Sequence, residues 1–165
     1  MSPLYYVSVT IHVLAAMLWL GGMFFLGVVG APLLRGLEPI LRQQVFQQLG
    51  QRFRLVGWAA ILVLIGTGAA NLYYRGWLHW DGVLGDAAFW RTPTGIVLSA
   101  KLAGVAVMIV VSALHDFVFG PLAGNAEPGS RQSASLRRWA ALLARINAMA
   151  GIIVVAAAVL LVRGG

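Results

Sequence analysis

The stretch of sequence that decides the fold is KLAGVAVMIVVSALHDFVFGP, residues 101–121. It is almost entirely apolar, but Lys101 opens it and His115 and Asp116 stand near its end. A helix needs ~20 mostly apolar residues to cross a bilayer, and this stretch is long enough. An ionisable side chain in hydrocarbon is costly, so Lys101 and His115 need a partner or a ligand in the folded protein.

The whole chain shares this apolar character. Of its 165 residues, 60% are hydrophobic and 10% are charged, and the mean hydropathy is +0.84. A soluble domain carries roughly 25% charged residues, so the composition excludes that class. The net charge is +7, but the arginines lie between apolar runs and form no stripe, which argues against nucleic-acid binding. There is no cysteine, which excludes disulfides, zinc–thiolate sites and iron–sulfur clusters.

Apolar runs predict four membrane spans, at approximately 4–30, 55–75, 95–120 and 139–162. We therefore predict an all-α fold, an integral membrane four-helix up-down bundle that forms a single transmembrane domain over residues 1–165. Pro121 is expected to end the third span, because proline cannot continue a helix. No strong internal repeat is visible in the sequence.

The arginines predict how the chain is oriented. They concentrate between the first and second spans and between the third and fourth, whereas the loop between the second and third spans holds only Arg75 and Arg91. Lys and Arg are enriched on the cytoplasmic side of membrane proteins. Both termini are therefore predicted to be periplasmic or extracellular.

The ionisable residues fall at two depths. At ~1.5 Å of rise per residue, His12 and Lys101 lie at a similar depth in the outer half of the bilayer. His115 lies roughly 21 Å deeper and on the same helix face as Lys101. The fourth span, which runs in the opposite direction, brings Arg145 near the level of His115, and Met23 of the first span lies there too.

Two polar zones follow from these depths. The outer zone contains His12, Lys101 and, if its loop folds back over the bundle, His79. The inner zone contains His115, Asp116, Arg145, Met23 and Asn147. Because each axial ligand lies ~2 Å from a haem iron, His12 and His115 cannot both bind one haem.

Purely structural roles stay open for each of these residues. His12 and His115 could hydrogen-bond to neighbouring helices, and Lys101 could extend to the outer headgroups. Arg145 could extend to the cytoplasmic surface or pair with Asp116. The methionines that lie in the spans are expected to serve packing: Met17, Met23, Met108 and Met149. Ionisable residues inside membrane spans nevertheless mark functional sites, and their grouping in two layers favours a function.

A b-type haem fits the pattern of each zone. Haem iron binds a neutral imidazole, and Lys or Arg can neutralise the propionates. The sequence therefore predicts a cytochrome b-like protein with one or two haems, for electron transfer or for small-molecule redox chemistry as a haem-dependent oxidoreductase. His12 would bind the outer haem, with His79 or Lys101 as sixth ligand, and His115 the inner haem, with Met23 or no residue opposite. The candidate cofactor-binding residues are His12, Trp19, His79, Lys101, His115 and Arg145, of which the histidines would bind metal.

Copper is the main alternative cargo or cofactor. Cu(I) binds His and Met, and methionines lie in the predicted bundle. No closely spaced pair of the MxxM kind is present. A membrane protein that transports or handles copper therefore remains an alternative. The glycine-rich helix faces also predict a homo-oligomer, and the haem interpretation implies a redox partner.

Two segments resemble a known membrane family. HVLAAMLWLGGMFFLGVVGAPLLR (residues 12–35) is similar to the first helix of CopD-like proteins, named after copper resistance protein D, and of the related HemJ-type protoporphyrinogen oxidase. TPTGIVLSAKL (residues 92–102) resembles the start of their third helix. The resemblance implies a four-helix bundle in the bacterial inner membrane. The HemJ-type pattern implies His12 as a haem ligand with Lys101 as its companion, and leaves an oxidase activity as a third alternative.

Overall fold

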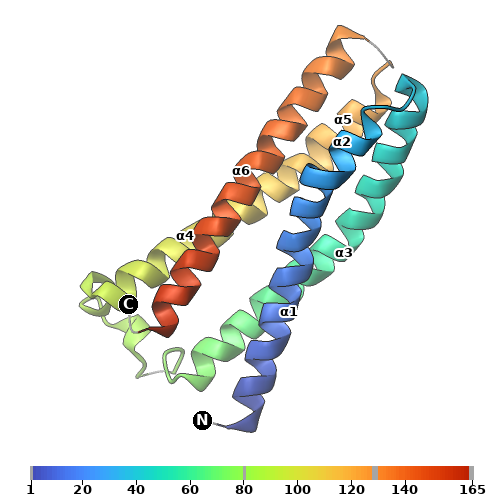
Figure 1. Ribbon diagram of the computed structural model, residues 1–165. Helices are drawn as coiled ribbons and strands as arrows, with labels where there is room; N and C mark the ends of the chain where they lie inside the picture. Colours follow the sequence, from blue (N-terminus) through green and yellow to red (C-terminus); the bar gives the residue numbers. More distant parts are fainter. Residues whose placement is uncertain (1, 80, 128–129, 164–165) are drawn as a thin grey trace.

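The computed structural model describes residues 2–79, 81–127 and 130–163, and every regular element within them is a helix. The helices long and apolar enough to cross a membrane number four: Pro3–Leu34, Pro39–Tyr74, Pro93–Asn125 and Arg131–Val162. They run up and down beside one another as an elongated bundle (Figure 1). The predicted all-α, four-helix bundle is confirmed.

The first and third of these helices each contain one π-helical turn. The first is built from α1 (Pro3–Phe25), the π turn η1 (Leu26–Gly30) and α2 (Ala31–Leu34). The third is built from α4 (Pro93–Leu114), the π turn η4 (His115–Phe119) and α5 (Gly120–Asn125). The second and fourth are the single helices α3 (Pro39–Tyr74) and α6 (Arg131–Val162). Two short 3-10 turns, η2 (Val83–Gly85) and η3 (Phe89–Arg91), lie between α3 and α4.

A proline explains each π turn. In an α-helix the proline ring clashes with the carbonyl four residues earlier, which is Val28 for Pro32 and Phe117 for Pro121. Both carbonyls lie inside a π turn, whose wider winding relieves the clash. The expectation that Pro121 ends the third helix was wrong, because the helix continues past it to Asn125.

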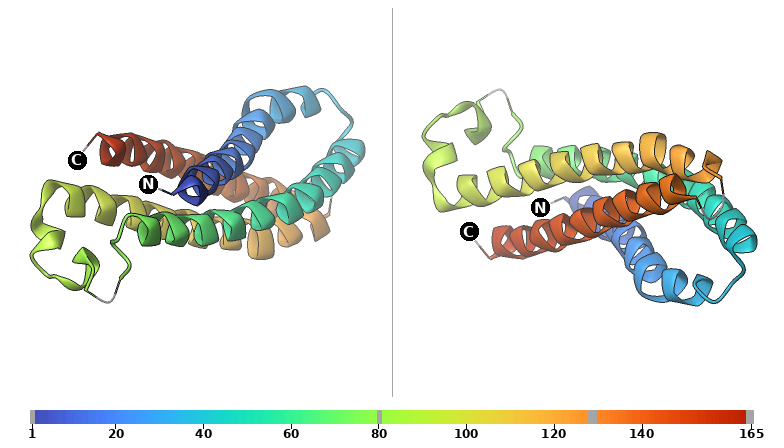
Figure 2. Two further views of the ribbon diagram at one scale, coloured as in Figure 1. Left: turned by 90° about the horizontal axis from the view of Figure 1, so that it is seen from below. Right: turned by 90° about the horizontal axis from the view of Figure 1, so that it is seen from above.

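The two halves of the chain repeat the same architecture. The π turns stand 89 residues apart, from 26 to 115 and from 30 to 119. The same spacing relates His12 to Lys101. In space α1 packs along α3 and also contacts α6, while α4 packs along α6 and α5 contacts α3. Figure 2 shows the two helical hairpins from below and from above the view of Figure 1. Pro32 and Pro121 are also 89 residues apart, but most other equivalent positions hold unlike residues, so the repeat is hard to see in the sequence.

The core lies at mid-height, where the hairpins meet. Buried there are Trp19, Ala60, Ile61 and Met108, and partly buried apolar side chains pack around them. Most other long apolar side chains face outward, as expected where lipid is the solvent. Both termini lie at one end of the bundle together with the α3–α4 loop, and we call this the terminal end (Figure 1). The end at which α2 and α5 lie is called the arginine-rich end.

Candidate functional site

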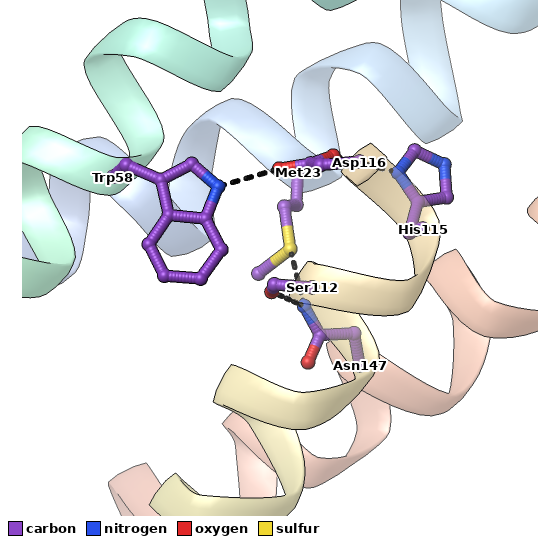
Figure 3. A network of polar contacts seen from close by, with 6 residues as sticks. All are labelled: Met23, Trp58, Ser112, His115, Asp116 and Asn147. Carbon is purple, nitrogen blue, oxygen red and sulfur yellow. Dashed lines mark hydrogen bonds and ion pairs between the residues drawn. The ribbon is translucent and has the colours of Figure 1, made fainter. Parts of the chain in front are cut away.

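Asn147 lies near the middle of α6 and joins three helices of the bundle (Figure 3). Its amide Nδ2 on α6 donates to the sulfur of Met23 on α1 at 3.3 Å and to the hydroxyl of Ser112 on α4 at 2.9 Å. Asn147 is only 4% exposed, and its Oδ1 is buried with no hydrogen-bond partner among the described residues. The amide therefore places a thioether at a polar junction inside the membrane.

Asp116 forms a second group of polar contacts, one helical turn after Ser112 on the same membrane-spanning helix. Its Oδ1 lies 2.9 Å from Nδ1 of His115, and its Oδ2 accepts a hydrogen bond of 3.1 Å from the indole Nε1 of Trp58 on α3. The carboxylate lies between these two rings (Figure 3). The side chains of His115 and Asp116 are 38% and 22% exposed. Two partners make the carboxylate tolerable at this depth. We call Met23, Trp58, Ser112, His115, Asp116 and Asn147 the inner network.

Arg145 does not join the inner network. Asp116 is bonded to His115 and Trp58, so the alternative in which Arg145 pairs with Asp116 is wrong. Arg145 is exposed on α6 and forms no ion pair with any residue in the described part of the chain. The structure thus leaves its guanidinium free to reach the lipid headgroups.

His12 is the centre of a second cluster, on the α1–α3 interface. Its Nδ1 lies 2.8 Å from the hydroxyl of Thr67. That hydroxyl donates its single proton to the carbonyl of Val63 at 2.6 Å, so it must accept the bond from His12. Nδ1 therefore carries the proton, and Nε2 is left with a lone pair. Metal-binding histidines are oriented by a bond of this kind.

Lys101 lies in the same cluster. It is close enough to His12 and to Arg75 for their charges to interact. The Nε of Arg75 donates to the hydroxyl of Tyr5 at 3.2 Å, and its guanidinium lies 5.5 Å from the ring of Trp77. We call Tyr5, His12, Thr67, Arg75 and Lys101 the outer cluster. Lys101 thus lies within electrostatic range of His12, and no hydrogen bond joins the two side chains in the described structure.

His79 and Trp19 lie elsewhere. The ring of His79 stacks on Tyr73 with centroids 4.8 Å apart, and its Nε2 lies 3.3 Å from the Tyr73 carbonyl. Its contacts are thus with the end of α3, and the side chain is exposed. Trp19 is buried in the core beside Met108. Within the described ranges, no three His, Cys, Asp or Glu side chains gather to hold a metal ion.

Sequence reasoning placed Met23 and Asn147 in the inner zone but missed the other uncharged members of both clusters. Trp58, Thr67 and Ser112 are common in membrane helices, so nothing in their chemistry singles them out. One signal was available: Thr67, Asn71 and Arg75 are spaced four apart, which places three polar side chains on one face of α3.

The fold and these clusters define a multi-pass membrane protein with polar side chains held between its spans. The family model for CopD, copper resistance protein D, matches residues 47–161. The chain belongs to this family, and the resemblance seen in the sequence is confirmed for CopD. An uncharacterized protein from Aquifex aeolicus (strain VF5) is 30% identical over 151 residues, which cover 88% of this chain and 86% of that protein. No solved structure matches the chain.

Proposed function

We propose that this protein handles copper in the membrane, with Cu(I) as cargo that contacts the inner network. The observation that carries the proposal is the thioether of Met23, which accepts a hydrogen bond from the amide of Asn147. The same amide bonds Ser112, which lies one helical turn before the His115–Asp116 pair. Cu(I) is a soft ion that prefers thioether and imidazole ligands. The family description, copper resistance protein D, points to the same metal.

The donors of the inner network favour Cu(I) over harder cations. Mg²⁺ and Ca²⁺ need several oxygen ligands, and the carboxylate in this network, that of Asp116, is already bonded to two side chains. A second thioether lies close by: Met108 is one helical turn before Ser112 on α4 and is 2% exposed. Met108, Met23 and His115 thus offer soft donors from the core to the arginine-rich end.

Copper binding is tested on the purified chain in detergent, with a Cu(I) chelator as competitor under reducing conditions. The wild type is expected to take Cu(I) from the chelator, and Met23→Leu to lower the affinity by about tenfold, the usual order of effect for a lost metal contact. Met149→Leu is the matched control, because Met149 is 66% exposed. Absence of Cu(I) binding by the wild type, or equal affinities for Met23→Leu and Met149→Leu, rejects the proposal.

The tautomer of His12 favours haem b as a second candidate. An Nδ1–H imidazole leaves Nε2 to bind a metal, and Lys101 beside it could neutralise a propionate. A reduced-minus-oxidised spectrum after haem-replete expression distinguishes the two candidates. A Soret band that His12→Ala removes supports haem, and its absence in the wild type eliminates haem.

We further propose that the protein resides in the bacterial inner membrane with its terminal end facing the periplasm. The arginines of the connections before α3 and before α6 support this orientation.

A further inference from the structure

An open groove of about 320 Å³ lies between the first membrane-spanning helix and α3. Its lining is apolar except for one arginine and includes Leu18, Gly22, Phe25, Leu49, Arg52 and Val56. A hollow of this size is at the lower end of the range that small-molecule pockets occupy. None of its lining residues belongs to the inner network or to the outer cluster, so the groove is a separate feature of the bundle.

The groove forms because the two helices diverge. α1 packs along α3, whereas α2 barely contacts it, so the pair separates toward the arginine-rich end (Figure 2). Gly22 permits the close part of this packing, since a Cβ there would overlap the ring of Phe53. Around the hollow, the side chains of Leu18, Phe25 and Val56 remain exposed. The groove is therefore an apolar surface that neither helix covers.

The groove runs from the membrane surface into the hydrocarbon. Arg52 lies three residues before the uncharged run of α3 that begins at residue 55, which places its guanidinium at the level of the lipid headgroups. Leu49 and Arg52 line the groove at this level, and Val56 lines it one turn deeper than Arg52. Along α3, Leu49 and Val56 are ~10 Å apart. A phospholipid has the same order of groups, with a phosphate at the surface and an acyl chain below it.

The charge of the groove selects its occupant. Arg52 is exposed and forms no hydrogen bond or ion pair with any residue in the described ranges. A planar guanidinium binds phosphate oxygens in pairs, so this side chain favours an anionic group. A second copy of the chain fits poorly, because arginines outnumber acidic residues in the segments at this end and the net charge is +7. Another copy would bring like charge to Arg52.

We infer that this groove binds one acyl chain of an anionic phospholipid of the bilayer, whose phosphate contacts Arg52. Basic pockets between membrane helices on the cytoplasmic side bind anionic headgroups in this way. The acyl chain covers the apolar walls, and the guanidinium selects the headgroup. The site goes beyond the proposed copper function, since it needs no metal.

The test is native mass spectrometry of the full chain, delipidated in detergent without copper. The chain is titrated with phosphatidylglycerol or with phosphatidylcholine of identical acyl chains. We expect one phosphatidylglycerol molecule to bind more tightly than phosphatidylcholine. Arg52→Gln should weaken phosphatidylglycerol binding by about tenfold, the order of effect of a lost charged hydrogen bond, and remove the preference. Arg131→Gln is the matched control, because it removes an exposed arginine from the start of α6 and should preserve the preference.

Filling the groove tests the acyl chain separately. Val56→Phe should weaken the binding of both lipids, because its ring would occupy the space of the chain. Val63→Phe is the matched control: Val63 lies outside the groove on the same helix and is 41% exposed, against 42% for Val56. If Val56→Phe does not fold, Arg52→Gln decides. Equal affinity of the wild type for the two lipids, wild-type binding by either folded variant, or a dimer that excludes lipid overturns the inference. Met23→Leu should leave this titration unchanged, so its failure is distinct from failure of the copper proposal.

Discussion

Asn147 and Met23, on the last and first helices of the bundle, are joined by a hydrogen bond of 3.3 Å from the amide Nδ2 to the sulfur. The same amide nitrogen donates to Ser112, so one side chain links both hairpins. A buried amide with an unpaired oxygen is a costly group in a membrane core. Its bond to Met23 in the other hairpin explains how it contributes to stability as well as to the inner network.

Asn147→Ala is expected to lower the free energy of unfolding by about 1 kcal/mol, because interhelical hydrogen bonds in membranes average ~0.6 kcal/mol and two are lost. Unfolding by sodium dodecyl sulfate in mixed micelles measures the change. Met149→Ala is the control on the same helix, since its side chain is exposed. Equal stability of the two variants would contradict the prediction.

Gly104 on α4 packs directly against Val154 on α6. A Cβ on it would lie 2.7 Å from Cγ2 of Val154, and a β-branched side chain has little freedom to move aside. Gly104→Ala should therefore destabilise the bundle by about 1–3 kcal/mol, as overpacking does. Gly66→Ala is the control, because its Cβ would meet nothing within 4 Å. The double variant with Val154→Ala should recover most of the loss, and a lack of recovery would refute the steric explanation.

Thr67→Val should remove the preference of His12 for the tautomer that carries its proton on Nδ1. Valine keeps the shape of the side chain but removes the acceptor for the Nδ1 proton, so the imidazole becomes a mixture of tautomers. Long-range ¹H–¹⁵N spectra of the histidine rings report this directly. Thr10→Val is the matched control: the hydroxyl of Thr10 donates to the carbonyl of Tyr6 and is exposed. A wild-type spectrum dominated by the Nε2–H form would disprove the assignment.

The proposed orientation predicts which cysteines, introduced one at a time by substitution, are accessible from outside the cell. The natural chain has none, so single substitutions report without interference. Val83→Cys in the α3–α4 loop should react with a membrane-impermeant maleimide in spheroplasts. Ile40→Cys at the start of α3 should react only after the membrane is disrupted. Both positions are exposed in the folded protein. The reverse labelling pattern would invert the orientation.

The sequence predicted the spans more accurately than it predicted their ends. Composition and length were enough for the four helices, but α3 begins at Pro39 and α6 at Arg131, well before the predicted spans at 55 and 139. Charged turns of helix outside the hydrocarbon cannot be recognised by hydropathy. The two π turns were not predicted either, because a proline in a helix is compatible with an end, a kink or a wider turn.

The candidate site was predicted in part. The helical rise predicted that His12 and Lys101 lie at a similar depth, and the two lie within electrostatic range of each other. It also assigned Arg145 to the inner zone, but depth does not specify the face of a helix that points inward. The position of His79 could not be predicted, because it depends on the path of the loop that follows α3. In the structure, that loop stacks the His79 ring on Tyr73.

By itself, the sequence determined that lipid surrounds most of this protein and that its ionisable residues lie at two depths. Its apolar runs require lipid, and the helical rise assigns each ionisable residue a depth, since both are local properties of the chain. Only the tertiary structure decided the partners. Asp116 accepts a hydrogen bond from Trp58, Asn147 donates one to Met23, and Thr67 determines which nitrogen of His12 is protonated. These pairs form because the rotation and packing of each helix select which faces meet. Those choices depend on side chains from other helices, which no single stretch of sequence contains.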